Sequence, residues 1–392
     1  MKRIKGLLFG LCALLLITAL PICRAADNTA AIDRKIRILK TVYKDGEYWN
    51  GQNGPNQTGR KKCACRTSCG NCACDCGAFT VDGWTYAWQC MGFACKMGYQ
   101  LFGQNPYTDG WEKCYGTPDI TVGDIVRYRA TDKNGTPKGY DHAIFIYETD
   151  GDTVYFADCN RTGPCQVSWS GKTDRKTLLE RLSLRLSGAN STGYVWHYTQ
   201  NNYQPESHRP THHSFTDVPE KAWYAEAVNY TYAAGIVNGV STTLFDPDGL
   251  LTRAMFVRLL YNLGGTKASE AMPFTDVAPR DWFYESVRWA YQNGIVKGMS
   301  ATRFAPDEPI TREQMCVMLS NFASFIGCPL PQGTADFTDR ALLHAWGRKA
   351  VGACQKAALI SGMGGGRFAP NDTATRAQAA KLFMEFDRKI IP

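Results

Sequence analysis

The sequence lacks any long block of lysine and arginine, although its 44 basic residues exceed its 36 acidic ones and give a net charge of +8. A nucleic-acid-binding surface requires such a concentration of positive charge, so the sequence does not indicate one. It also lacks the composition of a disordered chain, because 44% of its residues are hydrophobic and only 20% are charged. A length of 392 residues is enough for two or more globular domains.

The chain has one long apolar run, from Gly6 to Leu20, and three basic residues precede it: Lys2, Arg3 and Lys5. The run is too short to favour a permanent membrane span, and the tripeptide that ends at Ala25 is typical of a signal-peptidase site. We therefore interpret residues 1–25 as a signal peptide and predict a secreted protein without a membrane span after cleavage. The alternatives are an uncleaved anchor and a lipoprotein at Cys23, which the bulky Ile22 disfavours.

Cysteine is abundant, with 16 residues in the chain. Six of them form a dense cluster in an insert spanning residues 63–76: Cys63, Cys65, Cys69, Cys72, Cys74 and Cys76. Such density in an exported chain is typical of disulfide bonding. The spacing also offers tetrahedral ligand sets for zinc or another thiophilic metal, and reduced thiols are a third possibility. Outside this cluster the sequence predicts no metal site and no cofactor.

The C-terminal half contains three copies of one sequence unit. Each copy opens with Phe-Thr-Asp, at Phe215, Phe274 and Phe337, and a tryptophan follows eight or nine residues later. A glycine-rich segment comes next, and each copy then reaches a Thr-Arg pair: Thr252-Arg253, Thr311-Arg312 and Thr375-Arg376. We place the copies at residues 215–265, 274–326 and 337–388.

The Thr-Arg pairs are predicted to begin helices, because threonine is a favourable N-cap residue. Apolar residues follow each pair at helical spacing, for example Phe256, Leu259, Leu260 and Leu263 in the first copy. The preceding segments, Trp223–Ala234, Trp282–Gln292 and Trp346–Ala357, are also predicted to be helical. Each unit is therefore helix, loop, helix, and three such apolar stripes can bury one another where a single one could not.

These units resemble S-layer homology repeats, a family in which three repeats form an all-α pseudo-threefold prism. The resemblance implies that grooves between repeats bind secondary cell wall polysaccharide through an Asp, a Trp and an Arg from each copy: Asp217, Trp223 and Arg253; Asp276, Trp282 and Arg312; Asp339, Trp346 and Arg376. An arginine forks onto a carboxylate and an indole stacks on a sugar face, so the chemistry is reasonable. The alternative is that the tryptophans are core residues and the arginines pair with the aspartates. The third copy carries Gly364–Gly366, so its groove is expected to differ.

Residues 201–214 separate the two halves. They are rich in Asn, Gln, Pro and Ser and also hold His208, His212 and His213. We interpret this stretch as a polar linker, since no cysteine or carboxylate cluster accompanies the histidines to favour a metal site.

In the N-terminal region, residues 26–200, a cysteine, a histidine and an acid stand in sequence order at the ends of predicted helices and strands. A helical pattern begins at Gln89-Cys90, and Gly123–Tyr128 is predicted to be a strand. A second strand is predicted to open at His142, and a third to run over Thr153–Ala157 and end at Asp158-Cys159-Asn160. A thiol at a helix N-terminus, a histidine opposite it and an Asp or Asn on the next strand are what a papain-like site requires.

These segments resemble the cysteine- and histidine-dependent amidohydrolases and peptidases (CHAP family), which implies an α+β papain-like fold. The resemblance makes Cys90 the nucleophile, His142 the general base and acid, and either Asp158 or Asn160 the orienting group. Gln89 and the Cys90 amide would stabilise the oxyanion. The alternatives are that Cys90 lies in a disulfide and that His197 takes the place of His142; Cys95 and Cys114 lack the flanking pattern.

The whole sequence thus predicts a multidomain, wall-anchored cysteine hydrolase of a Gram-positive-type cell envelope. Its substrate would be an amide bond of peptidoglycan, cut as an endopeptidase or an N-acetylmuramoyl-L-alanine amidase, and its partners peptidoglycan and wall polysaccharide. The first alternative is a non-catalytic, disulfide-rich surface protein for binding or adhesion. The second is a protease that acts on host or bacterial proteins.

Overall fold

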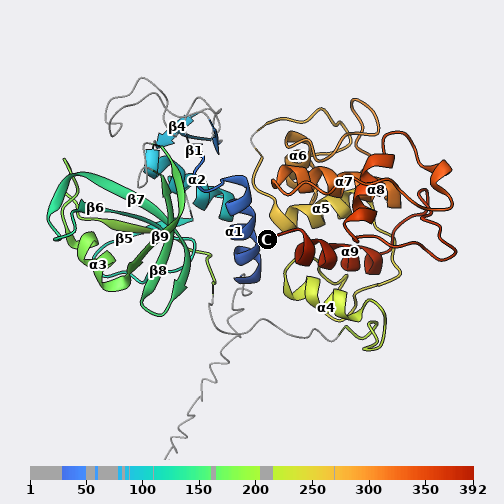
Figure 1. Ribbon diagram of the computed structural model, residues 1–392, viewed down its shortest axis with the longest axis horizontal. Helices are drawn as coiled ribbons and strands as arrows, with labels where there is room; N and C mark the ends of the chain where they lie inside the picture. Colours follow the sequence, from blue (N-terminus) through green and yellow to red (C-terminus); the bar gives the residue numbers. More distant parts are fainter. Residues whose placement is uncertain are drawn as a thin grey trace, which may run out of the picture.

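The computed structural model describes most of the chain as two domains with one helix between them (Figure 1). The described residues are 29–49, 58–60, 78–81, 84–87, 89–108, 110–159, 165–203, 215–268 and 270–392. The expected signal peptide, the cysteine cluster at 63–76, Asn160 and most of the expected linker therefore lie outside the described residues. Within the described ranges, no helix is both long and apolar enough to cross a bilayer.

The N-terminal domain is built on a six-stranded antiparallel sheet. Its strand order is β5 (Trp111–Cys114), β10 (Tyr194–Tyr198), β6 (Ile125–Thr131), β7 (Pro137–Asp150), β8 (Thr153–Cys159) and β9 (Val167–Asp174). Side chains alternate across the strands, so Ile125 and Phe145 pack under α2 (Gln89–Phe102), whereas Val126 and Ile144 pack under α3 (Arg175–Ser183). Two short hairpins complete the domain: β1 (Tyr48–Trp49) with β2 (Thr58–Gly59), and β3 (Phe79–Val81) with β4 (Trp84–Ala87).

Two strand boundaries differ from the predictions. β7 begins at Pro137, so His142 lies inside a strand instead of opening one. The cause is the preceding turn, where the Asp132 carboxylate accepts hydrogen bonds from the backbone of Asn134 and Thr136 and extends the β6–β7 hairpin. β8 likewise continues through Asp158 to Cys159, because Asp158 still pairs with Ser168 of β9.

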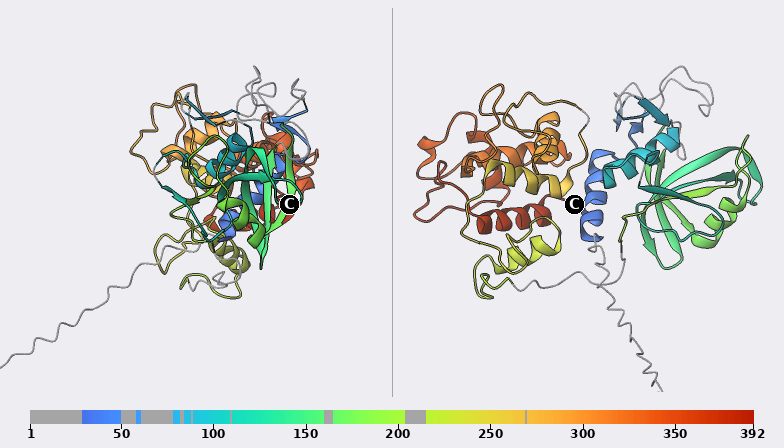
Figure 2. Two further views of the ribbon diagram at one scale, coloured as in Figure 1. Left: turned by 90° about the vertical axis from the view of Figure 1, so that its left-hand side faces the viewer. Right: turned by 180° about the vertical axis from the view of Figure 1, so that it is seen from behind.

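The C-terminal domain consists of three helix pairs arranged in a ring (Figures 1 and 2). The pairs are α4 (Ala225–Ala233) and α5 (Arg253–Gly264), α6 (Tyr284–Gln292) and α7 (Arg312–Phe325), and α8 (Arg348–Lys356) and α9 (Arg376–Lys389), with a short 3-10 turn, η2 (Arg340–Leu342). The second helix of each copy packs against the first helix of the next, and α9 closes the ring on α4. The expected threefold arrangement of mutually buried stripes is therefore present in the described residues.

Local capping explains where these helices begin. The side chains of Thr252, Thr311 and Thr375 accept hydrogen bonds from backbone amides three residues later, as predicted. The first helix of each pair begins two residues after its tryptophan, so Trp223, Trp282 and Trp346 lie before the helices and not within them.

Helix α1 (Thr29–Val42) lies between the two domains and belongs to the core of both (Figure 2). Ile32, Ile36 and Leu39 pack into the core of the N-terminal domain, whereas Ile38 packs into the core of the helical domain. From the sequence, residues 26–200 are predicted to form one domain. The helix instead carries two apolar stripes and is shared by both domains.

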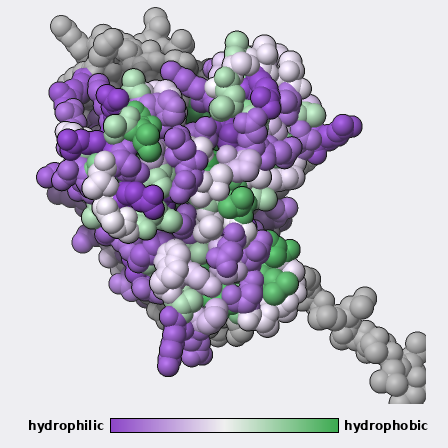
Figure 3. All heavy atoms as spheres, turned by 90° about the vertical axis from the view of Figure 1, so that its right-hand side faces the viewer, coloured by the Kyte–Doolittle hydropathy of each residue, from purple (hydrophilic) through white to green (hydrophobic). Residues whose placement is uncertain are grey.

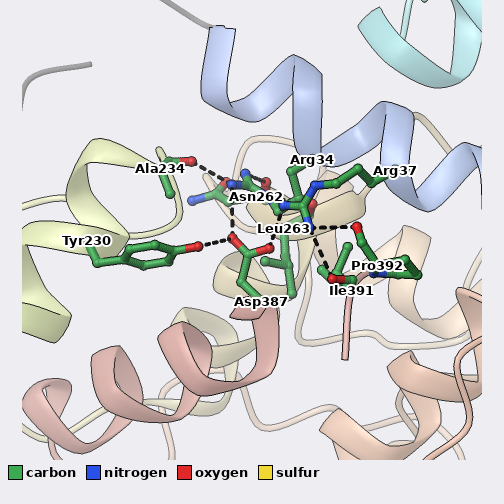
Figure 4. Close-up of polar contacts among 9 residues, drawn as sticks. All are labelled: Arg34, Arg37, Tyr230, Ala234, Asn262, Leu263, Asp387, Ile391 and Pro392. Carbon is green, nitrogen blue, oxygen red and sulfur yellow. Dashed lines mark hydrogen bonds and ion pairs between the residues drawn. The ribbon is translucent and has the colours of Figure 1, made fainter. Parts of the chain in front are cut away.

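A buried arginine fastens α1 to the helical domain (Figure 4). Arg34 donates hydrogen bonds to the carbonyls of Ala234 (2.8 Å), Leu263 (3.0 Å) and Asn262 (3.1 Å), which lie at the ends of α4 and α5. Its guanidinium also lies 3.8 Å from the carboxylate of Asp387 on α9, and both side chains are almost fully buried.

The carboxylate of Asp387 has two further partners at this end of the ring, Arg37 at 3.0 Å and the hydroxyl of Tyr230 at 3.1 Å. Arg37 also donates to the backbone carbonyls of Ile391 and Pro392 (Figure 4). Thr41, one turn further along α1, donates to the carbonyl of Ile326 in the second copy. α1 therefore contacts all three copies and closes one end of the ring.

Candidate functional site

Cys90 lies in the first turn of α2, directly after a sharp change of chain direction. Gln89 adopts a left-handed backbone conformation with φ of 55°, which is uncommon for a residue with a side chain. The chain thereby turns from β4 into α2 and places Cys90 at the helix N-terminus. At that position the helix dipole favours a thiolate.

Three side chains from three elements form one interacting series. The thiol of Cys90 on α2 lies near enough to the imidazole of His142 on β7 for each to shift the pKa of the other. Nε2 of the same ring lies 2.7 Å from Oδ2 of Asp158 on β8. Adjacent antiparallel strands supply the histidine and the aspartate, so the sheet sets their separation.

The electrostatics of this series favour a thiolate–imidazolium pair. Burial raises the pKa of Cys90, but the charge and hydrogen bond of His142, a bond from the Ala143 backbone and the charge of Arg127 outweigh it and bring the net pKa below its ordinary value. Burial lowers the pKa of His142, but Cys90 and Asp158 outweigh it and leave the net pKa well above its ordinary value. Each group therefore favours the charged form of the other.

Two neighbours of the series are not predicted from the sequence. Tyr128 on β6 lies opposite His142 in the sheet, and its ring meets the imidazole edge-on at 5.9 Å between centroids. Arg127, the preceding residue, pairs with Asp141 at 3.5 Å and contributes positive charge to Cys90. Both follow the Gly-Asp-Ile-Val motif, and strand alternation alone would have placed them on opposite faces of the sheet.

The rival residues lie in different surroundings. Cys95 is fully buried one and a half turns further along α2, and burial raises its pKa far above the ordinary range. The pKa of Cys114 is also raised, first by burial and then by Glu112 and Asp124. His197 forms a separate pair with the buried carboxylate of Asp124, with Nδ1 and Oδ1 2.8 Å apart.

The structure describes one of the two candidate orienting groups. Asp158 contacts His142, whereas Asn160 lies outside the described residues. The geometry available for the orienting role is therefore that of Asp158, whose shorter side chain reaches the ring because β8 continues past it.

In the helical domain, the three aspartates hold strained loops. Asp276 accepts hydrogen bonds from the backbone amides of Phe304 (2.8 Å) and Ala305 (2.7 Å), and Ala305 has a left-handed φ of 61°. Asp217 and Asp339 make the same pair of bonds in their own copies, again to a residue with positive φ. The carboxylates thus satisfy amides that the loop conformation would otherwise leave without partners.

The three arginines join each copy to the next. Arg253 donates to the carbonyls of Phe304 (3.0 Å) and Lys297 (3.2 Å) in the second copy. Arg312 makes the equivalent bonds to the third copy, and Arg376 makes them to the first. Arg253 and Arg312 are buried and Arg376 is half-buried. The aspartate–arginine ion pair considered as an alternative is not among the ion pairs of the described residues.

The three tryptophans are the exposed members of the predicted sets. Trp223, Trp282 and Trp346 are 61%, 57% and 54% exposed, so they are not core residues. The face of the helical domain turned away from α1 is mostly hydrophilic, with small separate apolar patches (Figure 3). An exposed indole presents an apolar ring face and one N–H donor to its surroundings.

Comparison with known proteins agrees with this reading of the helical domain. The model of the S-layer homology domain matches residues 214–255, 273–316 and 336–380. The C-terminal region therefore contains three S-layer homology domains, which indicate a protein associated with the cell surface or cell wall.

Curated relatives share part of the chain. An endoglucanase of Bacillus sp. (strain KSM-635) is 33% identical over 171 residues, which make up 43% of this chain and 18% of that protein. The S-layer protein EA1 of Bacillus anthracis is 26% identical over 182 residues, 45% of this chain and 20% of that protein. The chain thus spans about a fifth of the length of these relatives, and their names describe proteins with much additional sequence.

Solved structures of a protein named Ly7917 overlap the chain weakly. One covers 42% of this chain and 61% of that chain at 14% identity, with a TM-score of 0.22. Another, which holds "the hydrolyzing product of MDP", covers 26% and 36% at 18% identity, with a TM-score of 0.17. Overlaps this low carry no argument about the fold or the activity of the N-terminal domain.

Proposed function

We propose that this chain, which its three S-layer homology domains associate with the cell surface, is a wall-anchored cysteine hydrolase that cleaves an amide bond of peptidoglycan. The observation that carries the proposal is the series Cys90–His142–Asp158 at the N-terminus of α2, in which His142 lowers the pKa of Cys90 and lies 2.7 Å from Asp158. The bond would lie within the peptide or between muramic acid and L-alanine. The activity is tested by the release of soluble fragments from purified sacculi.

The proposed reaction uses each member of the series in turn. The Cys90 thiolate attacks the amide carbonyl, and the Cys90 amide with Gln89 would stabilise the oxyanion. The imidazolium of His142 gives its proton to the leaving amine as the carbon–nitrogen bond breaks, which leaves a thioester on Cys90. His142 then takes a proton from water, and the hydroxide releases the carboxylic acid and regenerates the thiolate. Asp158 holds the ring in position throughout.

The helical domain would attach the protein to the cell wall. We propose that Trp223, Trp282 and Trp346 contact wall polysaccharide, because their exposed faces suit a sugar ring. The buried arginines and the aspartates support the loops beside them. Attachment would raise the effective concentration of wall peptide at Cys90 without adding any catalytic contact.

Alkylation of Cys90 distinguishes the hydrolase from a non-catalytic, disulfide-rich surface protein. A lowered pKa keeps more thiolate present as the pH falls, so the iodoacetamide rate at Cys90 is expected to fall less between about pH 8.5 and pH 6.5 than the rate at an ordinary thiol. Cys114 is the control, because its raised pKa predicts modification only at the higher pH. Peptide mapping under non-reducing conditions would read both sites. A disulfide-bonded Cys90 would favour the binding protein instead.

Loss of the exposed tryptophans is expected to release the protein from walls. A Trp223→Ala, Trp282→Ala double variant should show at least about a tenfold lower retention by sacculi, because each stacking contact contributes roughly 1 kcal/mol or more. The matched control is Trp84→Ala, which removes an indole that is 73% exposed on the N-terminal domain. Removal of residues 215–392 should also release the protein, although it uncovers Ile38 of α1. Full retention of the double variant would contradict the assignment.

A further inference from the structure

Two cysteines lie buried at the junction between the second and third copies. Cys316 is on α7 and Cys354 is on α8, and these two helices pack against each other. The side chains are 1% and 0% exposed, and both carry free thiols in the structure. Neither thiol takes part in the proposed hydrolysis or in the proposed contact with wall polysaccharide.

The two cysteines contact each other across the junction. The thiol of Cys354 donates a hydrogen bond to the backbone carbonyl of Cys316, with the sulfur 3.8 Å from the oxygen. The side chain of Cys354, followed by burial, raises the pKa of Cys316 well above its ordinary value. The two side chains therefore lie near enough to interact.

Small side chains on α8 allow a close approach of the two helices. Its buried residues are Ala350, Val351, Gly352, Ala353 and Cys354. None of them is larger than valine, and helices approach most closely where the contact residues are small. At ordinary packing distances, facing α-carbons of two helices come to roughly 5 Å, a separation that a disulfide spans.

The other two junctions have equivalent positions without cysteine. On the second helix of each copy, the position lies four residues after the arginine of the Thr-Arg pair. On the first helix, it lies eight residues after the exposed tryptophan, and its carbonyl accepts a hydrogen bond from the amide five residues later in all three copies. The three buried pairs are Val257 with Ala290, Cys316 with Cys354, and Ala380 with Thr231. Packing at this place therefore does not require two cysteines.

We propose that Cys316 and Cys354 form a disulfide that joins the second and third copies covalently. The oxidant is a disulfide donor, which a protein associated with the cell surface can meet. The thiolate of one cysteine attacks a sulfur of the donor and releases a first thiol. The thiolate of the other cysteine then attacks the mixed disulfide and releases a second. The cysteines lose two protons and two electrons, and the donor gains both.

Burial favours exchange during folding over exchange in the finished ring. In the folded domain both sulfurs are shielded from a disulfide in solution, and the raised pKa of Cys316 keeps it in the less reactive thiol form. The bond would link residues 38 positions apart and so restrict the unfolded chain. Arg312, one turn before Cys316, already joins the same two copies through hydrogen bonds.

The test is refolding of the reduced full chain in a mixture of oxidised and reduced glutathione. Remaining thiols are then alkylated with iodoacetamide, and the protein is digested with trypsin without reduction. Mass spectrometry should find the peptide of Cys316 joined to the peptide of Cys354, lighter by two hydrogen atoms than the two reduced peptides together. No lysine or arginine separates Cys316 from Cys328, so the same product from a Cys328→Ser variant assigns the bond to Cys316.

The bond should also raise the Tm of the helical domain by about 5–10 °C over the reduced protein. The matched control is a Cys316→Val, Cys354→Ala double variant, which copies the pair Val257 and Ala290 of the first junction and should fold without the redox-dependent shift. Alkylation of both cysteines after refolding, a glutathione adduct on either, or a bond to any other cysteine overturns the proposal. A shift that persists in the double variant overturns the stabilising role of this bond.

Discussion

Replacement of Cys90 by alanine is expected to lower amide hydrolysis in purified sacculi by a factor of about 10⁴ or more, to background. The reason is that Cys90 is the thiol coupled to His142, whereas Cys95 is buried in the core between α2 and the sheet and its thiol has a strongly raised pKa. Alanine nearly matches the volume of cysteine, so the buried first turn of α2 should keep its packing. The measurement is fragment release over time, with mass spectrometry to identify the bond that is cut.

Cys95→Ala is the matched control for this experiment, because it removes a buried thiol from the same helix without touching the series. Its hydrolysis rate should stay close to wild type. Asp158→Asn should retain part of the activity, since an amide oxygen still accepts from the ring but no longer stabilises its charge. Undiminished lysis by a folded Cys90→Ala protein would exclude the thiol mechanism and leave the binding-protein alternative or another enzyme class.

Replacement of Arg34 by alanine is expected to lower the free energy of unfolding by about 3–5 kcal/mol. The substitution leaves the carbonyls of Ala234, Asn262 and Leu263 without their donor and removes one of the two cations near the buried Asp387 (Figure 4). Each buried polar group left without a partner costs about 1–3 kcal/mol. Denaturant unfolding followed by tryptophan fluorescence measures the loss.

A second measurement on the Arg34 variant separates docking from general stability. A protease site inserted between residues 203 and 215 allows the chain to be cut between its domains. After cleavage, the two halves of the wild type should elute together in gel filtration, because α1 stays packed on the helical domain, and those of Arg34→Ala should separate. Arg37→Ala is the control with a smaller loss, because this side chain is 38% exposed. Wild-type halves that separate would show that α1 does not hold the domains together.

The sequence by itself determined the features that depend on near neighbours. Each Thr-Arg pair caps a helix through a bond only three residues long, so Thr252 and its equivalents were predictable. The helix at Gln89 and the strands that hold Ile125 and Val154 also followed from periodicity. Strand ends were less predictable, because the turn at Asp132 extended β7 past the expected start at His142.

Tertiary structure alone decided what depends on distant segments. From the local sequence alone, Arg376 is predicted to bind a ligand. In the structure its guanidinium instead donates a hydrogen bond to a backbone carbonyl 138 positions away in the chain, and this bond helps to close the ring. The choice of Asp158 as the contact of His142, the Glu313–His344 pair and the insertion of Arg34 into the far domain likewise join residues from different elements. Local pattern cannot specify such contacts, because burial and hydrogen-bond partners are set by whichever surfaces the completed fold brings together.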